Sequence, residues 1–290
     1  MNWKIIMHQS SGNCEKFLVQ LLSGHVVEVA AIRHNGLLHL CMPSQIGCAV
    51  HCKHCATTFS ECPFGGNLSY SVLNQITNSF IKRYSTEKIA LSFSAHGEPL
   101  LNWQCISTII GNNCEKVHSV FVTTIGIVRT LDEILQSKNR FVVFYFSIHG
   151  TNDAQRALLI PDSPQFARLD KVIDFTNEYV KGGGRVVWNY MVHSKNCSNQ
   201  DVLSLILLLK RINVDITLRI TPYVTVKSET ECVPSIIPAT QKDFENFVHA
   251  ISNHSEEVSN VSFHVSHIEG RDINVACGQM RAHFREDKNT

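Results

Sequence analysis

Three closely spaced cysteines are the residues of this sequence with the clearest chemistry. They lie in the stretch Cys48-Ala-Val-His-Cys52-Lys-His-Cys55. Thiolates bind zinc and iron–sulfur clusters, and a four-iron cluster normally takes four cysteine ligands. Three cysteines in one loop therefore predict a [4Fe-4S] cluster whose fourth iron is open to an outside ligand. A structural zinc site that uses Cys52-x-x-Cys55 is the alternative, although the sequence offers no clear second pair of ligands at similar spacing.

The open iron of such a reducing cluster is the place where S-adenosylmethionine (SAM) binds in radical-SAM enzymes. One electron then splits the sulfonium and releases a 5′-deoxyadenosyl radical, which is chemistry that side chains do not provide. The cysteine spacing thus predicts two cofactors, a [4Fe-4S] cluster on Cys48, Cys52 and Cys55, and SAM.

The composition is that of a globular protein without a membrane segment. The chain has 290 residues, of which 44% are hydrophobic and 18% charged. Its eleven cysteines, in a chain without a recognisable signal peptide, favour a reducing compartment and metal-binding or catalytic thiols. Wholly apolar runs such as 205–209 are too short to span a bilayer. We therefore expect a cytoplasmic protein.

Strand and helix patterns alternate along most of the chain. An Asn-Gly turn signal at residues 35–36 predicts a hairpin between strands 26–32 and 37–41. Further strands are predicted at 89–94, 119–124, 141–148, 185–192, 216–221 and 261–265, and helices at 71–83, 105–111, 129–136, 166–180, 200–212 and 241–253.

About six strand–helix units predict an α/β fold, specifically an open or partial parallel (β/α)6 barrel with a short N-terminal β extension. We expect the extension to comprise residues 1–33 and the core, with a C-terminal segment that carries Cys277, residues 34–290. In such folds the reactive groups sit where strands end.

Two strand ends in the first half of the chain carry unusual residues. After strand 89–94 comes Gly97-Glu98-Pro99-Leu100, where a glycine permits close approach to a ligand and a carboxylate can bind the α-amino group of methionine. Glu-Pro also begins helices, which is the alternative. After the next strand, the hydroxyls of Thr123 and Thr124 can contact a ribose or carboxylate, or simply cap the following helix.

Two later segments complete the set of candidates. Strand 141–148 ends in Ser147-Ile148-His149-Gly150, where a lone histidine is more often a packed or capping residue than a ligand. Near the C-terminus, Cys277 is flanked by alanine and glycine, and is therefore sterically open as a reactive thiol must be. An ordinary buried cysteine is the alternative at that position.

Together, these residues resemble the radical-SAM 23S ribosomal RNA adenine methyltransferases. Enzymes of that family methylate a ring carbon of adenine in large-subunit RNA and, in some members, transfer RNA. The matching stretches run from about Glu28 to Gln279, and comprise Leu40-Cys41-Met-Pro-Ser-Gln45-Ile-Gly-Cys48, the cluster loop, Gly66-Asn67-Leu68, Gly97-Glu98-Pro99-Leu100-Leu101-Asn102, Thr124-Ile125-Gly126-Ile127-Val128, Ser147-Ile148-His149-Gly150-Thr151-Asn152-Asp153 and Asp272-Ile273-x3-Cys277-Gly278-Gln279. Ordinary radical-SAM enzymes do not carry both Cys41 and Cys277, so these two cysteines make the match specific.

The resemblance implies a methyl-cysteine relay with three catalytic residues. Cys277 takes a methyl group from one SAM, and the radical from a second SAM abstracts hydrogen from this S-methyl group. The resulting methylene radical adds to the adenine ring carbon. Glu28, 13 residues before Cys41, then removes the ring proton, and Cys41 attacks the Cys277 sulfur to form a transient disulfide and release the product.

The resemblance also implies cofactor contacts and partners. The SAM-contacting positions of the family correspond here to Gly97, Glu98, Thr123, Ser147, Ile148, His149 and Val224. The expected partners are an RNA substrate, from the ribosome or transfer RNA, and an electron donor such as flavodoxin or ferredoxin. We expect the protein to be a monomer.

The sequence departs from the family pattern at places that concern RNA. Val224 replaces an asparagine, and Ser266 and Glu269 replace arginines, although Arg271 lies nearby. About 27 residues precede Glu28, so we expect a short form without the N-terminal helical RNA-binding domain. The net charge is only +1, and any RNA surface must therefore be a local patch. These features keep two alternatives open: the same relay on a nucleotide, peptide or small metabolite, and an iron–sulfur protein without turnover.

Overall fold

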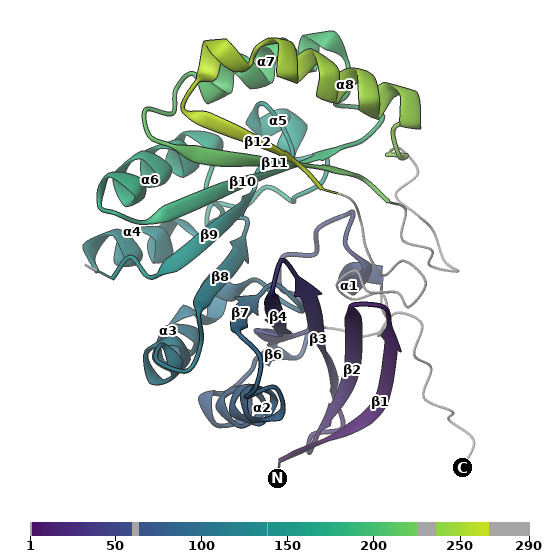
Figure 1. Ribbon diagram of the computed structural model, residues 1–290, viewed down its shortest axis with the longest axis vertical. Coiled ribbons are helices and arrows are strands. Elements are labelled where there is room, and N and C mark those ends of the chain that lie inside the picture. The colour runs from purple at the N-terminus through teal and green to yellow at the C-terminus, as the bar shows by residue number, and fades with distance from the viewer. Residues whose placement is uncertain (1, 60–63, 138, 225–235, 267–290) are drawn as a thin grey trace. The chain divides into compact units, whose positions relative to one another are not determined.

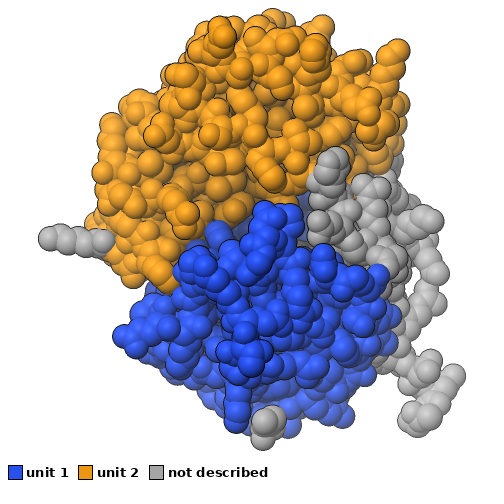
Figure 2. Space-filling model, in the orientation of Figure 1, with its two compact units in different colours: residues 1–123, 228–230, 269–290 blue, residues 124–227, 231–268 orange. Residues whose placement is uncertain are grey.

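The computed structural model describes residues 2–59, 64–137, 139–224 and 236–266, which fall into two compact units (Figures 1 and 2). The first unit contains the described residues up to Thr123, and the second contains those from Thr124 to residue 266. Each unit combines strands with helices.

Unit 1 begins with four antiparallel strands. They are β1 (Trp3–Ser11), β2 (Cys14–Leu21), β3 (Val26–His34) and β4 (Leu37–Met42), paired in chain order. At the β3–β4 turn, Asn35 and Gly36 have φ angles of 49° and 72°, and two-residue hairpin turns favour such positive values because they match the twist of the strands. The predicted hairpin is therefore confirmed.

The pairing changes from antiparallel to parallel at β4. Strand β7 (Ile89–Phe93) lies parallel to β4, and β8 (Ser119–Thr124) lies parallel to β7. All five residues of β7 are buried, as expected for an apolar strand inside a parallel sheet. The other elements of this unit are the pair β5 (Gln45–Ile46) and β6 (Gly66–Asn67), the helices α1 (Ala56–Phe59), α2 (Tyr70–Arg83) and α3 (Trp103–Asn113), and the 3-10 turn η1 (Pro99–Asn102).

Unit 2 contains four strands in wholly parallel pairing. They are β9 (Val142–Ser147), β10 (Arg185–Val192), β11 (Ile216–Pro222) and β12 (Val261–Val265), paired in chain order. The connecting helices are α4 (Val128–Gln136), α5 (Asp153–Arg156), α6 (Leu169–Lys181), α7 (Asn199–Leu209) and α8 (Gln241–Asn253), with the 3-10 turn η2 (Ser255–Val258) after α8. Aromatic rings of Phe144, Phe146 and Phe175 pack together between β9 and α6.

Several helices differ from the sequence prediction; α3, for example, spans Trp103–Asn113 rather than 105–111. Helix α6 begins at Leu169 rather than at 166, because Phe166 forms a β-bridge with Ile127 instead of a helical turn. Helix α7 ends at Leu209 rather than at 212. The short helix α5 was not predicted; the Asn152 side chain accepts a hydrogen bond from the Gln155 N–H (2.8 Å) and starts it.

The predicted α/β class and the mainly parallel pairing are confirmed. The partial (β/α)6 barrel and the boundary between residues 33 and 34 stay predictions. Among the helices in the described part of the chain, none has the length and apolar character needed to cross a membrane.

Candidate active site

The three predicted cluster ligands lie on one loop of unit 1, between β5 and α1. The Cys55 N–H and the Thr58 hydroxyl both donate to the carbonyl oxygen of Cys52, at 3.1 and 2.8 Å. His51, in the middle of the loop, has a φ of 54°, which is uncommon for a residue with a side chain. The loop is therefore tightly wound, and Cys48, Cys52 and Cys55 are all partly buried free thiols.

The surroundings of Cys48 suit a metal-bound sulfur. Burial raises the pKa of the Cys48 thiol to about 12; the nearby Cys55 and Glu98 raise it further, whereas hydrogen bonds from the backbone N–H groups of Val50 and His51 oppose the shift. A thiol with a raised pKa keeps its proton near neutral pH and loses it when a metal binds the sulfur. Three thiols from one short loop, with two N–H groups directed at one sulfur, fit the donor set of a [4Fe-4S] cluster with an open iron.

The zinc alternative requires several ligands around one ion. Within the residues that the structure describes, no three Cys, His, Asp or Glu side chains form a group that could hold a metal ion. The choice between zinc and a cluster on Cys48, Cys52 and Cys55 therefore rests on the number and spacing of the cysteines.

Gln45 connects the cluster loop to the Gly97-Glu98 segment. Its Oε1 accepts hydrogen bonds from the backbone N–H of Ala49 in the loop (3.2 Å) and from that of Glu98 (3.0 Å). Its Nε2 donates to the Oδ1 of Asn67 (2.7 Å). One buried amide side chain therefore connects the cluster loop to a residue 53 positions beyond Gln45 in the sequence.

Gly97 is required by close packing against the residues after β4. Its φ is +95°, and a Cβ atom built there would lie 2.5 Å from the Ser44 Oγ and 2.6 Å from Cβ and Cγ of Gln45. The adjacent Glu98 is buried, and its Oε1 accepts the N–H of Leu100 (3.0 Å), which caps the turn η1. The helix-capping alternative is thus present in the structure, and the contact of Glu98 with SAM stays a proposal.

Glu28 and Cys41 lie on one face of the sheet in unit 1. Ala30 pairs with Cys41 across β3 and β4, and Glu28 is two residues before Ala30 on the same strand. Because side chains alternate between faces, the carboxylate and the thiol project to the same side. The Glu28 carboxylate is buried, with its Oε2 3.1 Å from Lys16 Nζ and 3.6 Å from His96 Nε2. Burial raises the pKa of the Cys41 thiol, while the Lys16 charge and hydrogen bonds with Ser94 and Ser92 oppose this.

The predicted contacts at the end of β8 have a structural use as well. Thr123 is partly buried. The hydroxyl of Thr124 accepts the N–H of Gly126 (2.8 Å), so it stabilises the turn after the strand; the N-cap of the next helix is Ile127, without a side-chain hydrogen bond, so Thr124 does not cap that helix. The role of Thr123 in binding SAM is not decided by these contacts and stays a proposal.

The end of β9 carries a strained histidine in unit 2. His149 is buried with a φ of 49°, and its backbone N–H donates to the carbonyl of Asn189 (3.4 Å), as does that of Ile148 (3.1 Å). Ser147 is partly buried and Ile148 fully buried. Residues in sparsely populated backbone regions persist where their surroundings hold them, often at ligand sites. Among the described residues, the other non-glycine residues with positive φ are Asn35 in the hairpin turn and His51 in the cluster loop.

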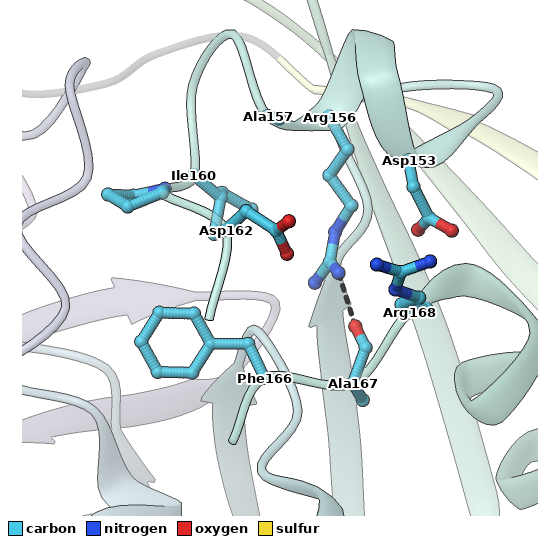
Figure 3. Close-up of a pocket in the computed structure, with 9 residues that line it drawn as sticks. Asp153, Arg156, Ala157, Ile160, Asp162, Phe166, Ala167 and Arg168 are labelled. Carbon is cyan, nitrogen blue, oxygen red and sulfur yellow. Dashed lines mark hydrogen bonds between the residues drawn. The ribbon is translucent and has the colours of Figure 1, made fainter. Parts of the chain in front are cut away.

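Arg156 holds the ends of β8 and β9 in unit 2 (Figure 3). Its buried guanidinium donates to the carbonyl oxygens of Ile125 (2.5 Å), Ala167 (2.5 Å) and Ser147 (3.4 Å). Figure 3 shows the guanidinium directed at the Ala167 carbonyl, in a small pocket that Asp153 and Arg168 also line. Arg156 therefore connects the residue that follows β8 to the last residue of β9.

The remaining predicted residues lie toward the C-terminus. Val224 follows β11 and is partly buried, and Ser266, which replaces a family arginine, accepts a hydrogen bond from Arg219 Nε (2.6 Å). A cation from β11 is thus present at this position even though residue 266 is uncharged. Cys277, Glu269 and Arg271 lie outside the described residues.

Sequence reasoning missed the residues that support these groups. Lys16, Gln45, His96 and Arg156 were not singled out as site residues. For Lys16 a signal was available, because a lysine at a buried position of a strand pattern needs a partner. For Gln45, His96 and Arg156 the partners are distant in sequence, and nothing in the local pattern indicates them.

The architecture matches that of radical-SAM enzymes. A radical SAM methyltransferase from Sphaerobacter thermophilus superimposes with a TM-score of 0.82 at 20% identity, over 97% of this chain and 82% of that one. Streptococcus suis SuiB, in complex with its precursor peptide SuiA, gives a TM-score of 0.60 at 12% identity, over 82% of this chain and 50% of SuiB. The fold is therefore one that radical-SAM enzymes use.

Proteins with similar sequences indicate which kind of radical-SAM enzyme this chain resembles. The probable dual-specificity RNA methyltransferase RlmN of Clostridium perfringens (strain 13 / Type A) is 26% identical over 294 residues, 97% of this chain and 79% of the relative. That of Synechocystis sp. (strain ATCC 27184 / PCC 6803 / Kazusa) is 26% identical over 281 residues, 94% of this chain and 75% of the relative. No protein-family model matches the sequence. The resemblance predicted from the motifs is confirmed: the chain is a homologue of the RlmN-type RNA methyltransferases.

Proposed function

We propose that this protein is a SAM-dependent RNA methyltransferase that methylates an adenine ring carbon through a methyl-cysteine relay. The observation that carries the proposal is the placement of Glu28 and Cys41 on one sheet face, on the neighbouring strands β3 and β4 that precede the three-cysteine loop. A buried carboxylate and a thiol are the two groups that the relay needs for proton removal and for release of the product.

The residues of the loop and of the strand ends would hold the cofactors. Cys48, Cys52 and Cys55 would bind the [4Fe-4S] cluster, which when bound supplies the electron that cleaves SAM. The contacts with SAM would come from Gly97, Glu98, Thr123, Ser147, Ile148, His149 and Val224.

In the proposed reaction, the Cys277 thiolate first attacks the methyl carbon of one SAM, displaces S-adenosylhomocysteine and carries the methyl group as a thioether. Once that carbon has joined the adenine ring, the Glu28 carboxylate accepts the ring proton, and the one electron that the ring must also lose would return to the cluster. The Cys41 thiolate then attacks the Cys277 sulfur; the new sulfur–sulfur bond replaces the sulfur–carbon bond, and the carbon keeps the electron pair and takes a proton to become the methyl group. An external thiol must reduce the Cys41–Cys277 disulfide before the next turnover.

The disulfide is proposed only as a transient species. The eight cysteines that the structure describes are all free thiols, and Cys277 is not among them.

We also propose a flavodoxin or ferredoxin as electron donor, a monomeric state and a cytoplasmic location.

Mass spectrometry of nucleosides tests the substrate and the relay together. Ribosomal and transfer RNA would be isolated from cells that lack their own adenine-carbon methylase and that express either this protein or its Cys277→Ala variant. A methyladenosine that requires the unaltered protein supports the proposal. If no methyladenosine forms while the purified protein still cleaves SAM, the acceptor is a nucleotide, peptide or metabolite rather than RNA, as the net charge of +1 would permit. If SAM is not cleaved under reducing conditions, the protein is not an active enzyme.

A further inference from the structure

A lysine is buried in unit 1 beside the proposed proton acceptor. Lys16, on β2, is 1% exposed, and its Nζ lies 3.1 Å from the Oε2 of Glu28, which is also 1% exposed. A charged group inside a protein is retained only when a partner compensates for the lost hydration. The ammonium and the carboxylate therefore depend on each other.

The strand register places Lys16 close to Cys41 as well. Lys16 pairs with Ala30 across β2 and β3, and Ala30 pairs with Cys41 across β3 and β4. Directly paired residues of neighbouring strands project to the same face of a sheet. The residue between Lys16 and Cys41 in this row is an alanine, whose short side chain leaves room for the long lysine side chain above β3.

The Cys41 thiol responds to this lysine. Burial raises the pKa of Cys41, and the positive charge of Lys16 opposes that rise together with hydrogen bonds from Ser94 and Ser92. Ser92 is the residue that pairs with Cys41 across β4 and β7, so it extends the same row. The thiolate is the nucleophilic form of cysteine, and a nearby cation favours it.

A histidine occupies the other side of the carboxylate. The Nε2 of His96 is 3.6 Å from Glu28 Oε2, and His96 is fully buried. Its carbonyl oxygen accepts hydrogen bonds from the N–H (2.7 Å) and the hydroxyl (3.1 Å) of Ser44, which fixes the segment after β7. The charged and titratable groups that face Glu28 are thus Lys16 from β2 and His96 from the β7 end, with Cys41 on β4.

We propose that Lys16 is a positioning residue shared by both reactive groups: its ammonium pairs with the Glu28 carboxylate and orients it, and stabilises the Cys41 thiolate. The inference rests on the proposed function, since it assigns Lys16 to the relay. In the proposed reaction a single cation then serves two successive steps, proton removal by Glu28 and attack by Cys41. Neither step requires Lys16 to exchange a proton or to touch the substrate.

The test measures the reactivity of Cys41 in the cluster-loaded protein. Iodoacetamide would be applied over a range of pH, and peptide mass spectrometry would give the alkylation rate of Cys41 separately from that of other cysteines. In Lys16→Met we expect the Cys41 titration to move to higher pH, with alkylation on the order of tenfold slower for each unit of that shift. In Glu28→Gln, which removes the anion and leaves the cation, we expect faster alkylation.

Because the alkylation rate of Cys41 should change in opposite directions in the two variants, the test distinguishes an electrostatic effect from loosened packing. A merely structural role would make Cys41 more accessible in both variants and would accelerate alkylation in both, which would overturn the proposal. Lys4→Met, on the exposed side of the neighbouring strand β1, is the matched control and should leave the rate unchanged. If Lys16→Met does not fold, the comparison of Glu28→Gln with Lys16→Met/Glu28→Gln decides: the double variant must alkylate more slowly than Glu28→Gln.

Turnover provides the second readout. For RNA methylation by Lys16→Met we expect a lower kcat with an unchanged KM for SAM, because the Glu28 carboxylate loses the cation that orients it. A normal kcat in a folded Lys16→Met protein would refute the assignment to Glu28. The alkylation result needs no RNA and no turnover, so it stands or fails independently of whether the protein methylates RNA.

Discussion

Replacement of Gly97 by alanine should damage the site through both backbone strain and crowding. A residue with a side chain at a φ of +95° costs about 1–3 kcal/mol. The new Cβ would also lie 2.5 Å from the Ser44 Oγ and 2.6 Å from two Gln45 atoms, and such overpacking costs about 1–3 kcal/mol more. The total of about 2–6 kcal/mol is a large part of the stability of an ordinary domain.

Gly24→Ala is the control that isolates the two contributions. Gly24 has a φ of +82°, but nothing lies within 4 Å of a Cβ built there, so only the backbone cost of about 1–3 kcal/mol applies. Denaturant unfolding of both variants should therefore show Gly97→Ala to be the less stable by about 1–3 kcal/mol.

The functional consequence concerns Gln45. Because Gln45 accepts hydrogen bonds from both Ala49 and Glu98, its displacement in Gly97→Ala should disturb the cluster loop and reduce the iron bound after reconstitution, whereas Gly24→Ala should bind a normal amount. Equal stability of the two variants, together with normal iron content of Gly97→Ala, would refute the argument that close packing demands glycine at this position.

Three further predictions concern other parts of the protein. Cys41→Ala should accumulate a covalent protein–RNA adduct, visible on denaturing gels, because the link to Cys277 can form but not resolve. Arg156→Lys should destabilise the protein by about 2–3 kcal/mol, because a single ammonium nitrogen cannot take the positions of the two guanidinium nitrogens that reach Ala167 on one side and Ile125 and Ser147 on the other, and should raise the KM for SAM. Burial lowers the pKa of His193 from 6.5 to about 4, so between these pH values the unfolded chain binds a proton that the folded chain does not. The free energy of unfolding should therefore fall by about 3 kcal/mol as the pH is lowered from 6.5 to 4.

Each of these predictions has a control. Untrapped product at the normal yield from Cys41→Ala would exclude the disulfide step. An unchanged KM in a destabilised Arg156→Lys would confine that residue to a role in folding. For His193, the variant His193→Asn keeps an acceptor for the Lys195 N–H and should remove this part of the pH dependence; a variant as sensitive to acid as the original would assign the effect to other groups.

The sequence alone predicted those features that depend on residues close together along the chain. The three-cysteine spacing, the Asn35-Gly36 hairpin turn, and the limits of β8, β10, β12 and α8 all follow from residue types within a few positions of each other. The motifs around Cys41 and Gly97 likewise identified the class of relatives, because each motif is a short run of residues that can be recognised without knowledge of the fold.

Tertiary structure decided everything that depends on pairing between distant segments. The row that brings Lys16 to Glu28 and Cys41 crosses three strands, so it exists only once β2, β3 and β4 have paired. One hydrogen bond of Gln45 spans 53 residues and one of Arg156 spans 31, and the starting point of α6 depends on a bridge between Phe166 and Ile127. The chain thus carries its reactive groups in short motifs, whereas the charges that tune those groups come from residues that meet only in the folded protein.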